Sequence, residues 1–440
     1  MRIHFIGIGG IGLSALAKFL AGRGHRISGS DMRQSEITDD LALNYGAKIT
    51  IPHHPDAVEG ADRVIYSAAV RPSNVEYQRA KELGIELLSR KEALKFILED
   101  KEVYAVGGAH GKSTTSAMLA SLLPETNALI GAISKEFGSN VRSAPNDKVV
   151  FEADESDESF LNSNPKLAIV TNVEPEHMEY YEYDEERFYN AYRKFLELAH
   201  IRVLNGEDPF LYSLKEELPS SYLYPSRDLN NIEFVLVDGE PHTRFELRDL
   251  GRFEVFGFGT HIAVDAALAI LAAMELGEDP ETLRERLKNY RGIKKRFDII
   301  QNDEHCVVID DYGHHPTEIA ATLESLRTFA KMRGLSKFKV IWQPHKYTRT
   351  LDNLKGFVEC FEGVDELVIL PIWSAGEIEI PIDLKGAFSR YEPTMAHRVT
   401  REDGIVKVLD EKGQVLREFR EGLIAAFGAG DITYQIRGER

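Results

Sequence analysis

Short apolar runs alternate with amphipathic segments through the first hundred residues. This pattern predicts strands at 2–6, 26–30, 63–66 and 86–88, and helices at 12–21, 75–83 and 90–101. Strands that alternate with helices are typical of a parallel sheet covered by helices on its faces. The chain therefore begins with a predicted α/β domain.

The alternation restarts twice further along the chain. A new apolar strand at 103–106 leads into a glycine-rich turn and a helix from Lys112. An alanine-rich helix at 260–276 stops at Gly277. Later strands are predicted at 149–152, 167–171, 307–309, 339–342 and 366–370, with a long helix at 316–332. We predict an α/β protein of three domains in series, over residues 1–99, 100–296 and 297–440.

Composition narrows the class of protein. The net charge of −18 argues against a nucleic-acid-binding surface, which needs clustered Lys and Arg. The two cysteines, Cys306 and Cys360, lack the spacing of a zinc site or a redox pair. No run reaches the ~18 apolar residues that cross a bilayer, and no cleavage-type site follows the apolar N-terminus. We expect a cytoplasmic enzyme without membrane insertion, and predict nothing about its oligomeric state.

The first predicted strand ends in a glycine loop, Gly7–Gly12, of the G-x-G-x-x-G type. Glycines there allow a tight turn and let backbone N–H groups approach a diphosphate at a helix N-terminus. Asp31 follows the second strand, where an acidic residue would meet a ribose hydroxyl. Taken alone, the motif favours an NAD-dependent enzyme, and glycines that only serve strand–helix packing are the alternative. A nucleotide diphosphate is predicted here, of a kind that the motif leaves open.

A second glycine loop, Gly107–Thr114, resembles a P-loop between a strand and a helix. In such a loop, Lys112 would neutralise the β- and γ-phosphates and the Ser113 hydroxyl could bind Mg²⁺. The strict pattern fails at one position, because Val106 stands where it requires glycine. The alternative is a glycine-rich turn before a helix with an exposed lysine.

Two polar runs supply the carboxylates that a P-loop needs for Mg²⁺. The acidic run Glu152–Asp157 follows one apolar strand, and the run Thr171–His177 follows the next. His177 could be a second metal ligand. An acidic run is usually a solvated loop, but α/β sheets place their ligands at the carboxyl ends of strands.

Two more polar runs, Asp310–Glu318 and Gln343–Thr350, follow strands of the third block. Their cationic and polar groups suit an amino-acid carboxylate and acid/base partners. The alternatives are a helix cap for the first run and a basic surface loop for the second.

In this order, the motifs resemble the Mur ligases over nearly the whole chain. The resemblance rests on HFIGIGGIGLSALA (4–17), SGSD (28–31), GGAHGKSTT (107–115), EADESDESFL (152–161), TNVEPEHMEYY (171–181), KKRFD (294–298), DDYGHHPTEI (310–319), QPHKYTRT (343–350) and GAGDIT (428–433). It implies a Rossmann-like domain that binds a UDP-sugar, a central P-loop ATPase-type domain, and a Rossmann-like C-terminal domain for the amino acid. The first glycine loop would then bind UDP.

The resemblance also implies a role for individual residues. The UDP-sugar would be bound by Gly7, Gly9, Gly10, Ile11, Gly12, Asp31 and Ser67. ATP would be bound by Gly108, Ala109, His110, Gly111, Lys112, Ser113, Thr114, Asp265 and Arg296. Metal ligands would be Ser113, Glu155 and His177, and the amino acid would be bordered by Tyr312, His314, Lys346 and Arg349. The catalytic residues would be Lys112, Glu155, His177 and His314.

The resemblance is strongest to the branch that couples L-alanine to the lactyl carboxylate of UDP-N-acetylmuramate, through an acyl phosphate and a tetrahedral intermediate. It implies ATP and two Mg²⁺ ions, and no NAD is expected. Alternatives are a ligase that reattaches a recycled tripeptide to the same sugar, an NAD(P)-dependent oxidoreductase, and a UDP-sugar-binding protein without catalysis.

Overall fold

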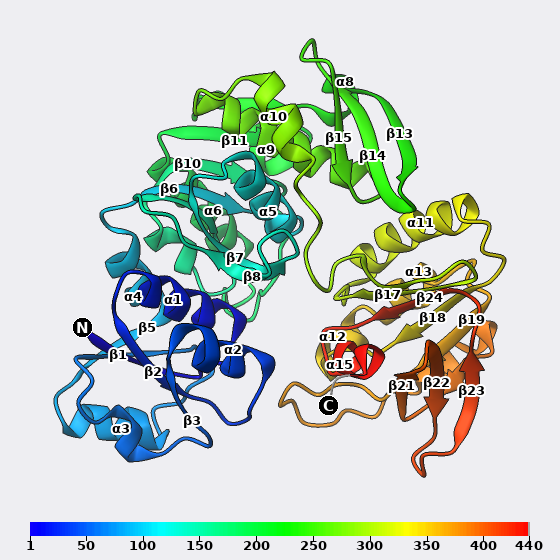
Figure 1. Cartoon of the computed structure of the whole chain (residues 1–440), viewed down its shortest axis with the longest axis horizontal. Helices are drawn as coiled ribbons and strands as arrows, with labels where there is room; N and C mark the ends of the chain where they lie inside the picture. The colour runs from blue at the N-terminus through cyan, green and yellow to red at the C-terminus, as the bar shows by residue number, and fades with distance from the viewer. Residues whose placement is uncertain (439–440) are drawn as a thin grey trace. The chain divides into compact units, whose positions relative to one another are not determined.

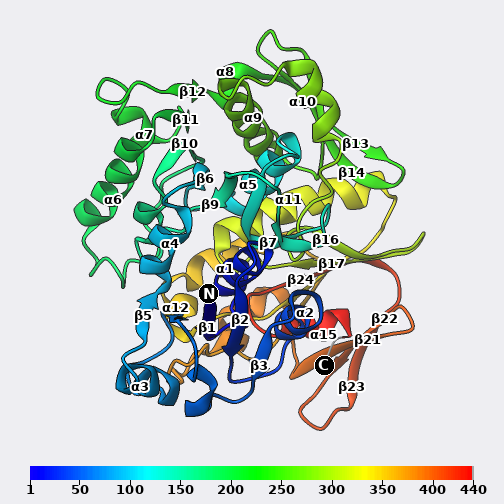
Figure 2. The ribbon, with the colours of Figure 1, turned by 60° about the vertical axis from the view of Figure 1, so that its left-hand side comes forward.

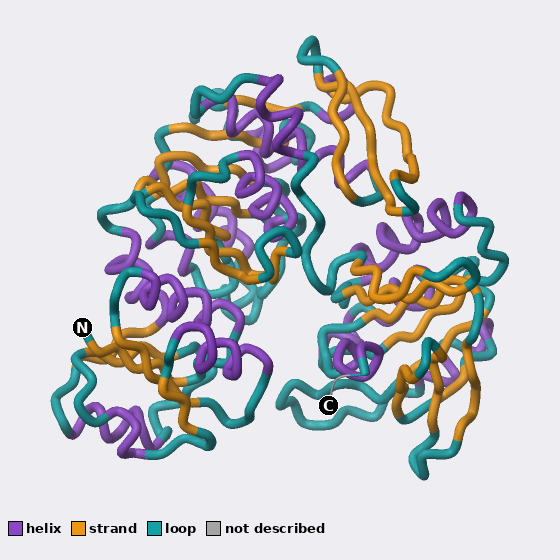
Figure 3. The backbone as a smooth tube through the Cα atoms, viewed as in Figure 1, coloured by secondary structure: helices purple, strands orange, loops and turns teal. Residues whose placement is uncertain are grey.

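The computed structural model describes residues 1–438 of the chain. The chain divides into two compact units. Unit 1 contains residues 1–232, 244–255 and 261–291, and unit 2 contains residues 233–243, 256–260 and the chain from Gly292 onward. The ribbon and the tube trace show strands accompanied by helices in each unit, as expected for an α/β protein (Figures 1 and 3).

Unit 1 begins with a five-stranded parallel sheet in the order β3-β2-β1-β4-β5. After β1, the chain forms β2 and β3 on one side of β1, and then crosses over to form β4 and β5 on its other side. The carboxyl end of β1 is therefore a topological switch point, where open α/β sheets bind ligands, and the first glycine loop starts there. The strands are β1 (Arg2–Ile6), β2 (Arg26–Ser30), β3 (Lys48–Thr50), β4 (Arg63–Tyr66) and β5 (Glu86–Ser89), and the helices are α1 (Ile11–Gly22), α2 (Glu36–Tyr45), α3 (Val75–Glu82) and α4 (Arg90–Leu98).

The second sheet of unit 1 has seven strands in the order β12-β11-β10-β6-β9-β7-β8. They are β6 (Glu102–Gly107), β7 (Asn127–Ser134), β8 (Ser139–Arg142), β9 (Lys148–Glu152), β10 (Pro165–Val170), β11 (Ile201–Asn205) and β12 (Ser221–Leu223). Only the β7–β8 pair is antiparallel. Because β6 lies between β10 and β9, the carboxyl ends of these three strands bring the second glycine loop, the acidic run and Thr171–His177 to one edge of the sheet.

Helices cover the second sheet and connect it to the first. Helix α1 contacts both β7 and β8, and the two ribbon views agree on this arrangement (Figures 1 and 2). The helices of this region are α5 (Lys112–Leu122), α6 (Glu185–Leu198), α7 (Pro209–Ser213), α8 (Pro225–Asp228), α9 (Thr260–Glu275) and α10 (Pro280–Leu287). A three-stranded sheet of β13 (Leu229–Val237), β14 (Glu240–Leu247) and β15 (Arg252–Phe256) has residues in both units.

Unit 2 is built on a six-stranded sheet in the order β16-β17-β24-β18-β19-β20, in which β16 is antiparallel. A smaller antiparallel sheet, β21-β22-β23, follows along the chain. The strands are β16 (Asp298–Asn302), β17 (Cys306–Asp311), β18 (Phe338–Trp342), β19 (Glu366–Ile369), β20 (Thr394–Met395), β21 (Arg398–Glu402), β22 (Ile405–Leu409), β23 (Val415–Phe419) and β24 (Gly422–Phe427), and the helices are α11 (Pro316–Met332), α12 (Tyr347–Asp352), α13 (Leu354–Cys360), α14 (Leu384–Ala387) and α15 (Ile432–Arg437).

The three mainly parallel sheets confirm the predicted α/β class. The predicted boundaries at 99/100 and 296/297 remain predictions, because the division into compact units joins the first two sheets in one unit. Strand β17 ends at Asp311, two residues later than predicted, so Asp310 and Asp311 belong to the strand and not to the loop after it. Within residues 1–438, no helix is long and apolar enough to cross a membrane.

Candidate functional site

Backbone hydrogen bonds from the end of β2 hold the first glycine loop. The N–H groups of Gly7 and Ile8 donate to the Ser30 carbonyl at 2.9 and 3.0 Å. Gly7 has a φ of 85°, which glycine adopts without steric cost. A Cβ on Gly7 would lie 2.9 Å from the Ser67 Oγ, so these two predicted site residues are close together. The N-cap of α1 is Gly10, which has no side chain to occupy the anion-binding end of the helix.

Asp31 closes the same loop from the side of β2. Its Oδ2 accepts the Gly9 N–H at 2.9 Å, and its Oδ1 accepts the Met32 N–H at 2.8 Å. The structure therefore places the carboxylate against the loop backbone. The contact between Asp31 and a ribose stays a prediction, and the hydrogen bond to Gly9 is a loop-shaping role that the sequence did not suggest.

Residues 108–111 of the second glycine loop lie against the end of β10. Gly108 has a φ of 135°, and a Cβ there would collide with the Thr171 Oγ1. The Ala109 N–H donates to the Asn172 carbonyl at 3.1 Å, and the His110 N–H donates to the Asn172 Oδ1 at 2.9 Å. Residues Thr171 and Asn172 thus fix the loop, and α5 begins directly after it at Lys112.

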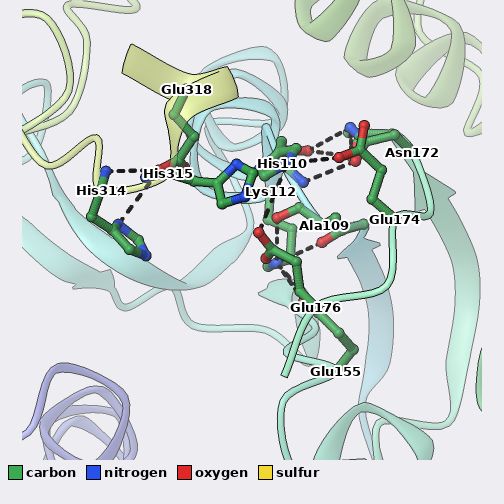
Figure 4. A network of polar contacts seen from close by, with 12 residues as sticks. Ala109, His110, Lys112, Glu155, Asn172, Glu174, Glu176, His314, His315 and Glu318 are labelled. Carbon is green, nitrogen blue, oxygen red and sulfur yellow. Dashed lines mark hydrogen bonds and ion pairs between the residues drawn. The ribbon is translucent and has the colours of Figure 1, made fainter. Parts of the chain in front are cut away.

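The Lys112 ammonium lies at the centre of this loop. Its Nζ donates to the carbonyls of Gly108 and Ala109 at 2.5 and 3.0 Å, and to the Glu155 Oε1 at 3.1 Å (Figure 4). Burial lowers the pKa of Lys112, but the negative charges of Glu155, Asp154 and Glu152 outweigh it and raise that pKa. Lys112 is therefore cationic, as a group that binds phosphate must be.

The acidic run after β9 supplies carboxyl groups in different electrostatic states. Burial raises the pKa of Glu155 to about 7, against the lowering effect of Lys112. Burial also favours the neutral form of Asp154, but Arg90 and Lys112 bring the pKa of Asp154 down to about 2. A fully buried carboxyl with a raised pKa next to a cationic lysine is typical of functional sites.

Ser113 points to another carboxyl of the acidic run. Its Oγ donates to the Glu152 Oε1 at 2.9 Å, while the Glu152 Oε2 accepts the Gly131 N–H at 2.6 Å. Burial raises the pKa of Glu152. The predicted metal ligand Ser113 is thus paired with Glu152, which the sequence analysis did not assign to the metal.

Glu155, Glu176 and His177 form a candidate cation site. Their ligand atoms all lie within 4.8 Å of one another. The carboxylate oxygens are the ligands that Mg²⁺ prefers, and the site contains no thiolate that would select a softer metal. The residues therefore fit a magnesium ion. The structure brings together the predicted ligands Glu155 and His177, and Glu176 joins them as a third candidate.

Asp265 lies under the second glycine loop. It is 7% exposed, and a Cβ on Gly111 would lie 2.6 Å from its Oδ1. Burial raises the pKa of Asp265 to about 8. Its carboxyl group is therefore protonated at neutral pH and stands against the loop backbone. Its contact with adenine, which the resemblance implied, stays a prediction.

Both glycine loops belong to unit 1, and Arg90 lies between the first of them and the acidic run after β9. A Cβ on Gly12 would lie 3.3 Å from the Arg90 guanidinium, and the Arg90 Nη1 lies 3.2 Å from the Asp154 Oδ2. A second link joins α1 to β8, because the buried Lys18 donates to the Asn140 Oδ1 at 2.9 Å. These contacts connect the first glycine loop and α1 to the acidic run and to β8, through side chains that the sequence analysis did not single out.

In unit 2, Glu318 at the start of α11 gathers several predicted site residues. Its Oε1 lies 3.0 Å from the Arg296 Nη1, and its Oε2 lies 3.4 Å from the His314 Nδ1. The His314 Nδ1 is also 3.1 Å from the Tyr312 carbonyl, which favours the tautomer with the proton on Nδ1. The pKa of His314 is lowered to about 3, mainly by burial. The cations Arg349 and Arg296 also lower this pKa, whereas the Glu318 carboxylate opposes the shift.

A second histidine extends this cluster. The rings of His314 and His345 pack edge to face at 5.9 Å, and the Arg349 Nη1 lies 3.0 Å from the His345 Nδ1. Lys346 has a φ of 69° and donates its N–H to the Trp373 carbonyl at 2.8 Å. The structure thus groups Tyr312, His314 and Arg349, while Lys346 is fixed through its backbone.

Sequence reasoning missed Glu176, Glu152, Glu318 and His345 as members of these clusters. Each of them lies in, or directly next to, a run that the sequence analysis had marked. Their position in the sequence could have identified them, because polar residues that follow neighbouring strands of a parallel sheet converge at the carboxyl ends of those strands. Which of several acidic residues points into the site depends on local backbone geometry.

The fold and the site define a multidomain α/β protein with a P-loop-type phosphate site, a carboxylate-rich cation site and a second glycine loop. Three family models match the chain in series: "Mur ligase family, catalytic domain" over residues 2–102, "Mur ligase middle domain" over 106–231, and "Mur ligase, glutamate ligase domain" over 295–414. The chain belongs to the Mur ligase family, which confirms the resemblance found in its motifs.

Individual relatives match along the whole chain. A UDP-N-acetylmuramate–L-alanine ligase of Campylobacter curvus is 55% identical over 99% of both chains. The enzyme of the same name from Helicobacter pylori strain P12 is 51% identical over 100% of this chain and 96% of its own. Among solved structures, the UDP-N-acetylmuramate-alanine ligase MurC of Thermotoga maritima has a TM-score of 0.83 at 27% identity, over 99% of this chain and 97% of that chain.

Proposed function

We propose that the protein is the ATP- and Mg²⁺-dependent ligase that joins L-alanine to the lactyl carboxylate of UDP-N-acetylmuramate in peptidoglycan precursor synthesis. The observation that supports this most is the ion pair of Lys112 with Glu155, beside Glu176 and His177, in the same compact unit as the first glycine loop. A phosphoryl-transfer site and a second diphosphate loop are what activation of a nucleotide-linked carboxylate requires. The names of the full-length relatives agree.

In the first chemical step, the sugar carboxylate attacks the γ-phosphorus of ATP and ADP leaves, which gives an acyl phosphate. The Lys112 ammonium and those N–H groups of residues 108–114 that are not bonded to Asn172 would stabilise the negative charge on the transferred phosphoryl group. Bound Mg²⁺ supplies charge neutralisation at the phosphates, and we propose two ions. Ser113, Glu155 and His177, together with Glu176, would hold them.

In the second step, the neutral amine of L-alanine attacks the acyl carbon and phosphate leaves from the tetrahedral intermediate. We assign Tyr312, His314, Lys346 and Arg349 to the amino-acid site, because Arg349 offers a bidentate fork for a carboxylate. With the proton on its Nδ1, His314 stays neutral and presents the lone pair of Nε2, which can accept a hydrogen bond from the amine and orient it for attack. Arg296 is assigned to the ATP phosphates.

The first glycine loop is assigned to the diphosphate of the UDP-sugar. Ile11 and Gly12 would donate backbone N–H groups at the start of α1, and Gly7, Gly9 and Gly10, which have no side chains, would let the diphosphate approach the loop closely. The assignment of Ser67 is supported by its place beside Gly7. The proposed substrates are small molecules, and we propose the cytoplasm as the place of action.

Phosphate release from ATP tests this function. We expect release with Mg²⁺, UDP-N-acetylmuramate and L-alanine together, and loss of release in Lys112→Ala. Release with the tripeptide L-alanyl-γ-D-glutamyl-diaminopimelate in place of L-alanine would assign the protein to peptide recycling instead. Failure with every acceptor, combined with UDP-sugar binding, would assign it to binding without catalysis.

A further inference from the structure

Tyr192 on helix α6 is one of the largest fully buried side chains of the protein. Its ring packs edge to face on Phe160 and on Phe188, with ring centroids 5.3 Å apart in both pairs. Phe160 follows the acidic run, and Phe188 lies one helical turn before Tyr192. Because both neighbours are themselves fully buried, the position of the phenol is fixed.

The Tyr192 hydroxyl has no hydrogen-bond partner among residues 1–438. Native proteins rarely leave a buried hydroxyl unpaired, since it has lost its hydrogen bonds to water. The nearby Tyr181 shows the usual outcome, because its hydroxyl donates to the Glu155 carbonyl at 2.5 Å. The unpaired oxygen of Tyr192 therefore requires a partner that residues 1–438 do not supply.

The surroundings of this hydroxyl indicate what the partner is. Phe188 packs on Tyr192 and also on Tyr181, whose hydroxyl is bonded to Glu155. In agreement with this position, burial raises the pKa of Tyr192 well above its ordinary value, and the charges that raise that pKa further include Glu155 and Glu176. These carboxylates are two of the three candidate ligands whose atoms lie within 4.8 Å of one another. A Mg²⁺ ion keeps several of its waters when it binds to protein, and such waters are strong hydrogen-bond donors.

We propose that Tyr192 is a positioning residue of the cation site, whose phenol oxygen accepts a hydrogen bond from a water ligand of the ion held by Glu155, Glu176 and His177. This inference rests on the proposed function, because it needs that cation site. Groups that hydrogen-bond to the ligands of a metal orient them, and their loss commonly weakens metal binding 10- to 100-fold. Tyr192 would thus hold the ion without touching it.

The test compares wild type with Tyr192→Phe, which removes only the hydroxyl. With Mn²⁺ as the probe, followed by electron paramagnetic resonance without nucleotide, we expect the variant to bind about tenfold more weakly. After treatment with a chelator, the variant should unfold at the same or a higher temperature than wild type, because it lacks the unpaired buried oxygen. A purely structural role for the hydroxyl would instead lower the unfolding temperature of the metal-free protein.

Tyr189→Phe is the matched control on the same helix, since its ring stacks on Phe210 and its neighbouring charges are Glu185 and Asp208. It should bind Mn²⁺ as wild type does. Unchanged Mn²⁺ affinity in Tyr192→Phe, or a metal-free variant less stable than wild type, would overturn the proposal. Mn²⁺ binding that is insensitive to Glu155→Gln would overturn the cation site itself, and phosphate release with L-alanine reports separately on the proposed function.

Discussion

The buried carboxyl of Asp265 gives a quantitative prediction for Asp265→Asn. Burial raises the pKa of Asp265 from 3.8 to about 8 in the folded protein. At any pH between these values, the folded protein holds a proton at this site that the unfolded chain has released. Asparagine is nearly isosteric with the protonated acid and cannot titrate, so the substitution removes this one contribution to the pH dependence of stability.

The sign and size follow from proton linkage. Because the folded state binds the extra proton, its stability falls as the pH rises from about 4 to about 8, and this dependence ends above about 8. One proton corresponds to about 1.4 kcal/mol per pH unit. Between pH 5 and pH 7, the wild type should therefore lose roughly 3 kcal/mol of unfolding free energy relative to Asp265→Asn.

Urea unfolding of both proteins at pH 5, 6 and 7 measures this difference, and titration of all other groups cancels in the comparison. Asp249→Asn, at an exposed position of unit 1, serves as the control and should follow the wild-type profile. Parallel pH profiles for wild type and Asp265→Asn would refute the reasoning. They would mean that the carboxyl is ionised at neutral pH and is compensated beside Gly111.

Three further predictions concern the proposed reaction. Gly108→Ala should abolish nucleotide binding in a fluorescent-ADP titration, because its Cβ would collide with the Thr171 Oγ1 at a φ of 135°; retained affinity would show that the loop relaxes freely. Arg90→Gln should change stability by less than about 1 kcal/mol, as expected for loss of one partly exposed ion pair. Arg90→Gln should nevertheless slow phosphate release about tenfold. An unchanged rate would show that Arg90 does not contribute to the proposed site. Glu318→Gln should raise the KM for L-alanine about tenfold by releasing Arg296 and His314, whereas an equal KM would place the amino acid elsewhere.

Much of the α/β framework could be predicted from the sequence. Strands at 2–6, 26–30 and 63–66 and the helix at 316–332 have the predicted bounds, because a strong apolar pattern is bounded by Gly, Pro or charged residues. The strands β7–β8, β13–β15 and β21–β23 were not predicted. Several of them are exposed on one or both faces, so they lack the continuous apolar run that marks a buried parallel strand.

The candidate site was predictable in its motifs and less so in its contacts. Lys112, Glu155 and His177 converge as the motifs predicted. The pairing of Ser113 with Glu152 and of Asp31 with Gly9 depends on side-chain directions at the ends of strands. The residue type alone does not fix these directions, since several carboxylates compete for the same few donors.

The placement of both glycine loops in one compact unit has a consequence for inhibitor design. Arg90 connects the first loop to the acidic run that lies beside the second, and Lys18 connects α1 to Asn140 of β8, so packed side chains link the two sheets within unit 1. A single molecule that carries a uridine diphosphate group and an adenine nucleotide on one linker would meet both proposed sites within one compact unit. Once one end is bound, the other experiences an effective concentration set by the linker, which can reach the millimolar range for a short one of matched length. Such a compound would gain affinity from two sites that both belong to unit 1.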